Sequence, residues 1–99
     1  FQGYGRTTVD DEGRYAFRTI RPVAYAGRSP HIHFKVQALG AGQLTTQMYV
    51  AGEPQNARDG VLRGIRNAKA RESVIVPLLP ASEIEPGAVK GTFDVVLDL

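Results

Sequence analysis

Two histidines separated by a single residue, His31 and His33, are the clearest candidates for chemistry in this chain of 99 residues, which contains no other histidine. Alternate side chains of an extended strand point to the same face, so both imidazoles can reach one object. A two-residue step along a strand is about 6.6 Å, and from that spacing each ring can place a nitrogen about 2 Å from a shared metal ion. The spacing favours metal chelation, although two exposed polar positions, or a half-buried pair bonded to the backbone, would show the same pattern.

A metal site at this pair needs further donors, because the chain has no histidine after His33 and no cysteine. Sites of the cupin, copper-zinc dismutase and metallohydrolase kinds recruit further histidines downstream and would therefore lack ligands here. The nearest other donor is Tyr25, which a turn containing Gly27 and Pro30 can fold back toward the histidines. A tyrosine has an ordinary pKa of about 10, so its phenolate needs a hard cation, and Fe(III) suits it better than Zn(II). Tyrosine together with histidine suggests ferric iron.

The residues around this group resemble the core of the intradiol ring-cleavage dioxygenases, the protocatechuate and catechol class. The resemblance rests on GRTTVDDEGRYAFRTIRPVAY at 5–25, on the motif Arg28, His31, His33, and on TTQMYV at 45–50 followed by GEP at 52–54. It implies a non-haem Fe(III) centre with Tyr25 as axial tyrosinate, His31 as axial histidine and His33 as equatorial histidine. It also implies a catechol-type substrate and O2, with the ring opened between its two hydroxylated carbons to a muconate-type diacid.

The resemblance implies catalytic roles for three residues. Tyr25 would leave the iron when the catechol binds and would take one catechol proton. Arg28 would stabilise negative charge that develops on the ring, although a surface arginine that caps the loop would look the same in the sequence. Gln47 would lie next to the metal ligands, on a neighbouring strand, and would face the same site as His31 and His33. Tyr49 should share that face because it lies two residues further along the same strand.

Two departures from the family pattern shape these expectations. Family members have a further tyrosine ligand upstream of the position matched by Phe1, so we expect the chain to be the C-terminal part of a longer enzyme. Tyr4 and Tyr15 are less favoured substitutes, since aromatic residues in strand-like runs usually pack across strands. Protocatechuate enzymes also carry a longer, tryptophan-bearing loop where this chain has two residues between Tyr25 and Arg28. The sequence is therefore compatible with catechol, a hydroxylated quinol or a larger lignin-derived phenol as the substrate.

The elements that must position these residues are mainly strands separated by turns. Strands are expected at 4–9, 15–20, 31–38, 44–50, 74–79 and 92–97. Turn compositions predict a connection at 10–13, a hairpin at 40–42 and a longer polar crossing at 80–87. The helical candidate at 57–68 contains two glycines and should form at most a turn or two. This pattern predicts an all-β fold, an antiparallel β-sandwich of short strands, in one domain over 1–99.

Composition excludes several other classes of partner. Twelve basic and ten acidic residues give a net charge of +2, and their interspersion argues against nucleic acid. No apolar run approaches the roughly 20 residues of a membrane span, and the absence of cysteine excludes disulfides. The composition is compatible with a homo-oligomer. The location is unassigned, with the cytoplasm slightly favoured, because any signal peptide would lie upstream of residue 1.

A second class of function fits the same chain. A catalytically incomplete β-sandwich could bind aromatic or carbohydrate ligands without turning them over, because fold does not fix function. Colour separates the two alternatives, since phenolate bound to ferric iron absorbs visible light and a binding module would be colourless.

Overall fold

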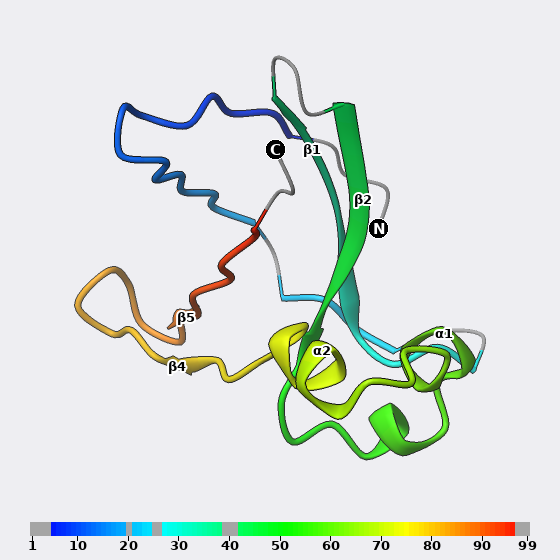
Figure 1. Cartoon of the computed structure of the whole chain (residues 1–99). Helices are drawn as coiled ribbons and strands as arrows, with labels where there is room; N and C mark the ends of the chain where they lie inside the picture. Colours follow the sequence, from blue (N-terminus) through cyan, green and yellow to red (C-terminus); the bar gives the residue numbers. More distant parts are fainter. Residues whose placement is uncertain (1–4, 20, 25–26, 39–41, 97–99) are drawn as a thin grey trace.

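The structure is a computed structural model that describes residues 5–19, 21–24, 27–38 and 42–96 (Figure 1). Two long strands are followed by three short helices and three two-residue strands. In chain order the elements are β1 (His31–Ala38), β2 (Gly42–Val50), the 3-10 helix η1 (Pro54–Ala57), α1 (Gly60–Arg63), α2 (Ala68–Ser73), β3 (Ile75–Val76), β4 (Leu79–Pro80) and β5 (Val89–Lys90).

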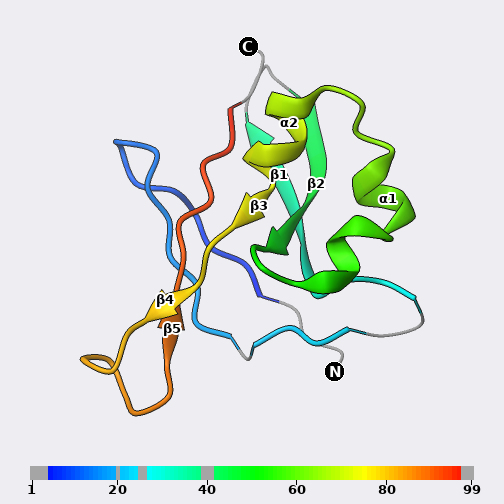
Figure 2. The ribbon, with the colours of Figure 1, turned by 90° about the horizontal axis from the view of Figure 1, so that it is seen from below.

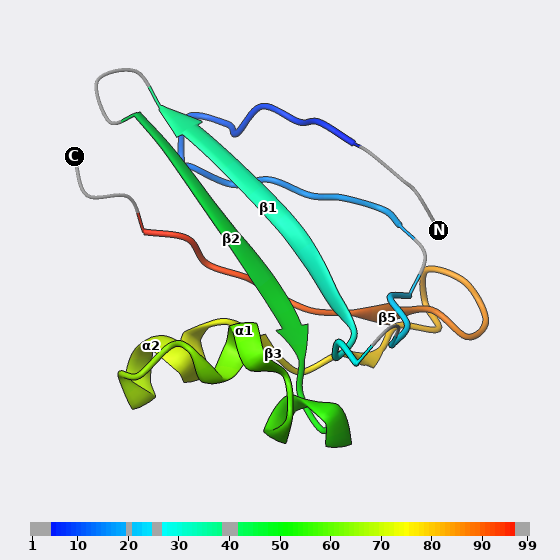
Figure 3. The same ribbon diagram turned by 90° about the vertical axis from the view of Figure 1, so that its right-hand side faces the viewer.

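The antiparallel pair β1 and β2 is the scaffold of the structure. Figure 3 shows it as one long twisted hairpin with the helices on one side. β3 pairs in parallel with the end of β2, giving a sheet of order β1-β2-β3, while β4 and β5 form a separate antiparallel pair. The register places His31 opposite Tyr49 and His33 opposite Gln47. By alternation these four side chains share one face of the hairpin.

The hydrophobic core lies on both sides of the C-terminal half of β2. Figure 2 shows α1 on one side of the β1/β2 pair and the extended runs of residues 5–19 and 91–96 on the other. The core is a cluster of buried side chains from β2, the helical segment, β3 and the C-terminal run: Met48, Tyr49, Leu62, Val74, Val76 and Phe93. The core therefore packs against both faces of β2 near its end, and Tyr49 contributes to it from the face that carries the histidines.

Aromatic rings attach the extended runs to the face of β1 that points away from the histidines. Phe34 lies 6.1 Å from Tyr15, 6.1 Å from Phe17 and 5.0 Å from Phe93, measured between ring centroids. The Tyr15 hydroxyl donates to the carbonyl oxygen of Phe93. Burial, with a smaller effect of Asp94, raises the pKa of Tyr15. Tyr15 therefore packs as a neutral phenol, as the strand pattern favoured, and does not reach the histidine face.

The β-rich character predicted from the sequence is confirmed, and β1 has the predicted bounds. β2 begins two residues earlier than predicted, at Gly42. The other strand predictions are less accurate: within 5–9, 15–19 and 92–96 the structure forms no strand. The runs at 15–19 and 92–96 contact β1 through aromatic side chains instead of a backbone ladder, and the residues of 5–9 are exposed. Among the described residues, one of the three strand pairs is parallel. A sandwich of two packed sheets remains a prediction.

The prediction of one strand at 74–79 is wrong, because the structure has two short strands there, β3 and β4. Val76 pairs with Val50, and the amide of Ala51 donates to the Val76 carbonyl oxygen at 2.9 Å. Pro77 follows and has no N–H to continue the ladder. Leu79 then pairs with Lys90. The crossing expected at 80–87 is consequently the loop of a hairpin between β4 and β5.

α1, which is one turn long, confirms the expectation of at most a turn or two within 57–68, whereas α2 begins at the end of that range and continues beyond it to Ser73. Asp59 precedes α1, and its side chain accepts hydrogen bonds from the amides of Val61 and Leu62, both at 3.0 Å. Asn67 precedes α2 and accepts from the amide of Ala70 at 3.1 Å. Both are N-cap residues of a preferred type. Across the described ranges, no helix combines the length and apolar character needed to cross a membrane.

Candidate active site

His31 and His33 lie side by side on one face of β1, as predicted, with ring centroids 5.0 Å apart and ring planes at 64°. His31 is only 8 % exposed, and its Nδ1 lies 2.7 Å from the carbonyl oxygen of Ser29. A carbonyl oxygen can only accept, so Nδ1 carries the proton and the neutral ring has its lone pair on Nε2. Histidines that bind metals are held in this way, with the other ring N–H donated to a carbonyl or carboxylate.

His33 is the more open of the two rings and is kept neutral by its surroundings. Burial, followed by the neighbouring His31 and the Arg28 guanidinium, lowers the pKa of His33. A neutral imidazole has a lone pair to give to a metal, whereas a protonated one does not. Tyr25 lies outside the described residues. In the part of the chain that the structure describes, no three His, Cys, Asp or Glu side chains gather closely enough to hold a metal ion.

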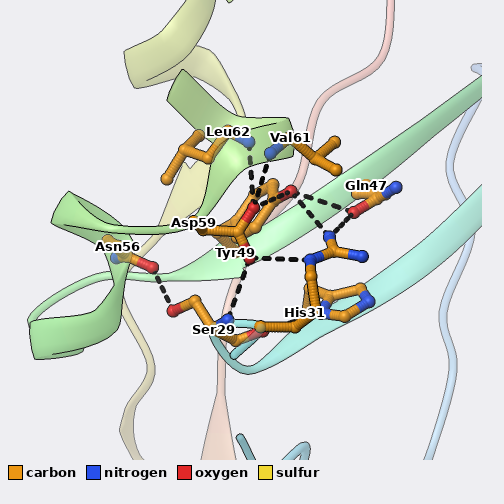
Figure 4. A network of polar contacts seen from close by, with 9 residues as sticks. Ser29, His31, Gln47, Tyr49, Asn56, Asp59, Val61 and Leu62 are labelled. Atoms are coloured by element: carbon orange, nitrogen blue, oxygen red, sulfur yellow. Dashed lines mark hydrogen bonds and ion pairs between the residues drawn. The ribbon is translucent and has the colours of Figure 1, made fainter. Parts of the chain in front are cut away.

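Gln47 faces the histidine side of the hairpin, which confirms the predicted face. Its Oε1 accepts from Arg28 Nη2 at 2.6 Å and from the Tyr49 hydroxyl at 2.9 Å (Figure 4). Because a guanidinium can only donate, this end of the amide must be the oxygen. The NH2 end of Gln47 is therefore directed away from Arg28.

Arg28 is held in place and is not the freely exposed loop arginine that the sequence left possible. Its side chain is 24 % exposed, and its Nε donates to Asp59 Oδ2 at 2.8 Å. Its Nη2 also donates to the Tyr49 hydroxyl at 3.2 Å, in addition to Gln47. The hydrogen bond to Asp59 raises the pKa of Arg28 further above its ordinary value. Arg28 is thus a permanent positive charge beside the histidines.

Tyr49 shares the histidine face, as expected, but its phenol is neutral. Its ring centroid is 5.8 Å from that of His31. Burial raises the pKa of Tyr49, and this effect outweighs the opposing hydrogen bond from Arg28. A neutral phenol that donates to Gln47 and accepts from Arg28 acts as part of the polar network and not as a phenolate ligand.

Asp59 is a central residue of this network that was not predicted from the sequence. Its side chain is fully buried, and Figure 4 shows it between α1 and the loop that leads into β1. It accepts four hydrogen bonds from N–H groups: from Arg28 Nε at 2.8 Å, the Ser29 amide at 2.9 Å, and the amides of Val61 and Leu62 at 3.0 Å. The Tyr49 hydroxyl, whose single proton lies toward Gln47, is 3.3 Å from Asp59 Oδ1. Burial alone would raise the pKa of Asp59, but these hydrogen bonds hold it well below its ordinary value. The sequence signal was the Asp-Gly pair before the apolar Val61 and Leu62, a helix start signature.

The loop before β1 is anchored a second time, at η1. The Ser29 hydroxyl donates to Asn56 Oδ1, and Asn56 Nδ2 donates to the carbonyl oxygen of Val50 at 2.8 Å. Ser29 is fully buried. Backbone and side chain of one residue therefore fix the loop that carries Arg28 and that orients His31.

A family model, curated proteins and a solved structure are similar to this chain. A family model described as dioxygenase matches residues 1–99. The chain is 40 % identical over 105 residues to the protocatechuate 3,4-dioxygenase beta chain of Burkholderia cepacia, covering 98 % of this chain and 44 % of that protein. It is 34 % identical over 90 residues to catechol 1,2-dioxygenase 2 of Acinetobacter lwoffii, covering 66 % of this chain and 33 % of that protein.

A solved structure is also similar along most of the chain. It is the dioxygenase domain of a dioxygenase carbohydrate-binding protein fusion from the cellulolytic bacterium Streptomyces sp. SirexAA-E, with a TM-score of 0.72 and 36 % sequence identity. The match covers 92 % of this chain and 51 % of that one. The chain thus spans 44 % and 33 % of the two curated relatives and 51 % of this structure.

Proposed function

The chain belongs to the intradiol ring-cleavage dioxygenase family, and from that premise we propose that its complete gene product cleaves catechol-type substrates between their two hydroxylated carbons, consuming O2. The observation that carries the proposal is one polar face of the β1/β2 hairpin. That face brings together two imidazole rings with centroids 5.0 Å apart and a guanidinium held by a buried carboxylate. The names of the relatives, which include a hydroxyquinol 1,2-dioxygenase from Rhodococcus opacus, support a dihydroxylated or trihydroxylated aromatic substrate.

We propose that His31, His33 and Tyr25 hold a ferric ion. The two histidines suit this role, because the Ser29 carbonyl oxygen fixes the tautomer of His31 and the surroundings of His33 favour its neutral form. The contribution of Tyr25 rests on its place in the family motif. When bound, the ion would supply Lewis acidity toward the catechol oxygens and make the ring reactive toward O2.

Arg28 is proposed to stabilise the negative charge that develops on the ring. Its guanidinium is close enough to His33 to lower the pKa of that ring, and it is charged at every working pH. A positive group that is already in position needs no reorganisation when the charge develops, and removal of one such contact typically slows turnover by about 10²- to 10³-fold. Gln47 is proposed to hold one side of this guanidinium and to offer its NH2 group to a substrate oxygen.

The scaffold of the site is proposed to be the antiparallel sandwich expected from the sequence. The aromatic contacts of Phe34 with Tyr15 and Phe93 already place two extended runs against the rear face of β1. In a sandwich these runs would belong to the second layer.

Metal analysis and oxygen uptake on the complete gene product test the proposal. Protein prepared with iron present should contain iron, absorb visible light, change that absorption when catechol is added, and consume O2 with catechol, protocatechuate or hydroxyquinol. Stoichiometric zinc without iron would contradict it. A colourless protein that binds catechols without O2 uptake would instead support an aromatic-binding module.

A further inference from the structure

Asp59 has no role in the function described so far, yet it contacts more of the site than any other acidic residue that the structure describes. We propose that Asp59 is a positioning residue, whose carboxylate sets the place of the Arg28 guanidinium and thereby the rate of ring cleavage. This inference rests on the proposed function. Asp59 is fully buried and so cannot touch a substrate itself.

One carboxylate oxygen connects Asp59 to the loop that carries Arg28. Oδ2 accepts from Arg28 Nε at 2.8 Å and from the amide of Ser29, the next residue, at 2.9 Å. The same atom therefore fixes both the side chain of Arg28 and the backbone just after it. Rotation of the guanidinium away from this position would break a charge-assisted hydrogen bond to a buried anion.

The other oxygen fixes the carboxylate itself. Oδ1 accepts from the amides of Val61 and Leu62, both at 3.0 Å, at the start of α1. With both oxygens bound to rigid groups, the carboxyl plane cannot turn. The position of Arg28 is thus set by α1, an element more than thirty residues away in the sequence.

One substitution can separate the contact of Asp59 with Arg28 from its contact with the start of α1. Asparagine is as good an N-cap as aspartate, so Asp59→Asn can keep its remaining oxygen on the amides of Val61 and Leu62. Its NH2 group would then face Arg28 Nε and the Ser29 amide, which are donors themselves. The substitution therefore removes the hold on Arg28 while it preserves the helix start.

The matched control is Asn67→Asp. Asn67 is the N-cap of α2 and accepts from the amide of Ala70, so this variant exchanges the same two residue types at a helix start outside the polar network. The experiment compares the iron-loaded complete gene product with and without each change. We expect Asp59→Asn to keep its iron and visible absorption and to change KM by less than about threefold. Its kcat should fall by about 10- to 100-fold, as expected when a catalytic group is misplaced. Asn67→Asp should leave kcat and KM unchanged.

A double variant separates positioning from a merely structural effect. In a background of Arg28→Ala, Asp59→Asn should lower kcat by less than about threefold, because the group that it positions is absent. An equal loss of kcat with and without Arg28 would overturn the proposal, and so would an unchanged kcat in Asp59→Asn alone.

A measurement on the metal-free protein is independent of turnover. The Arg28 Nε–H signal in a nitrogen-15 NMR spectrum, assigned by its loss in Arg28→Lys, should exchange slowly with solvent in the unsubstituted protein. It should exchange fast or vanish in Asp59→Asn. Fast exchange in the unsubstituted protein would overturn the proposal even if Asp59→Asn does not fold. If the proposed function is wrong, the unsubstituted protein and Asn67→Asp will both lack ring cleavage, while the NMR result still decides whether Asp59 holds Arg28.

Discussion

The contact of Arg28 with a buried carboxylate predicts that Arg28→Ala lowers stability as well as turnover. The Arg28 side chain is 24 % exposed, its partner Asp59 is fully buried, and the two groups are joined at 2.8 Å. Removal of Arg28 would leave a buried anion without its cation. If Arg28 served turnover alone, its replacement would leave the free energy of unfolding almost unchanged.

The structure also limits the size of this effect. Breaking a buried ion pair by removing one partner costs about 3–5 kcal/mol when the remaining charge has no other partner. Asp59 keeps three backbone donors in Arg28→Ala, the amides of Ser29, Val61 and Leu62, and the Tyr49 hydroxyl still lies 3.3 Å from its Oδ1. A hydrogen bond to a charged group contributes about 1.5–3 kcal/mol, and partial exposure places this one toward the lower end. We therefore expect Arg28→Ala to lower the free energy of unfolding by about 2 kcal/mol.

Urea unfolding followed by circular dichroism measures this effect, and the chain offers a matched control. Arg18 forms an ion pair with Glu85 at the same 2.8 Å, but the two side chains are 73 % and 59 % exposed. Arg18→Ala should cost less than about 1 kcal/mol, because exposed ion pairs contribute little. Equal losses in the two variants would refute the argument from burial. Because Arg28→Ala affects both properties, its turnover should be compared on folded protein with matched iron content.

Three further predictions concern acid stability, metal binding and backbone packing. Since the pKa of Asp59 is held below its ordinary value, the ionised carboxylate stabilises the fold above about pH 4, and this stabilisation is lost as the pH falls toward the lowered pKa. The difference in unfolding free energy between the unsubstituted protein and Asp59→Asn, measured in urea, should therefore shrink below about pH 4. A difference that stays constant with pH would contradict this. His33→Ala should lose iron and visible absorption, whereas Lys35→Ala, two residues along the same face, should keep both; iron retained in His33→Ala would exclude it as a ligand. Gly91→Ala should destabilise the fold by about 1–3 kcal/mol, because a Cβ there would lie 2.8 Å from a Val76 methyl group. Gly60→Ala, with open space around its Cβ in the first turn of α1, should stabilise it by about 0.5–1 kcal/mol; thermal unfolding that shows the same sign for both would contradict the packing argument.

The part of the site that follows from local rules was predictable from the sequence. Alternation along β1 placed His31 and His33 on one face, and the same rule applied to β2 placed Gln47 with Tyr49. The register between the strands, which the hairpin sets, brought the two pairs opposite each other. These predictions depend on neighbours in the sequence or on one short connection.

The part that depends on distant contacts was not predictable in the same way. Asp59 reads locally as a helix N-cap, and nothing near it in the sequence shows that its second oxygen binds Arg28, 31 residues earlier. The runs at 15–19 and 92–96 have the composition of strands, but a strand needs a partner at the correct distance. In this structure those runs find aromatic side chains instead.

The central claim is that the polar face around His31 and His33 serves intradiol ring cleavage, and mass spectrometry of the product formed from catechol in oxygen-18 gas tests it most directly. Cleavage between the two hydroxylated carbons converts both into carboxyl groups, so the complete gene product should yield a muconate-type diacid that carries one heavy oxygen atom in each. His33→Ala should yield none of it. An aldehyde acid, which forms when the ring opens beside the hydroxylated carbons, would contradict the account, and so would a diacid without heavy oxygen.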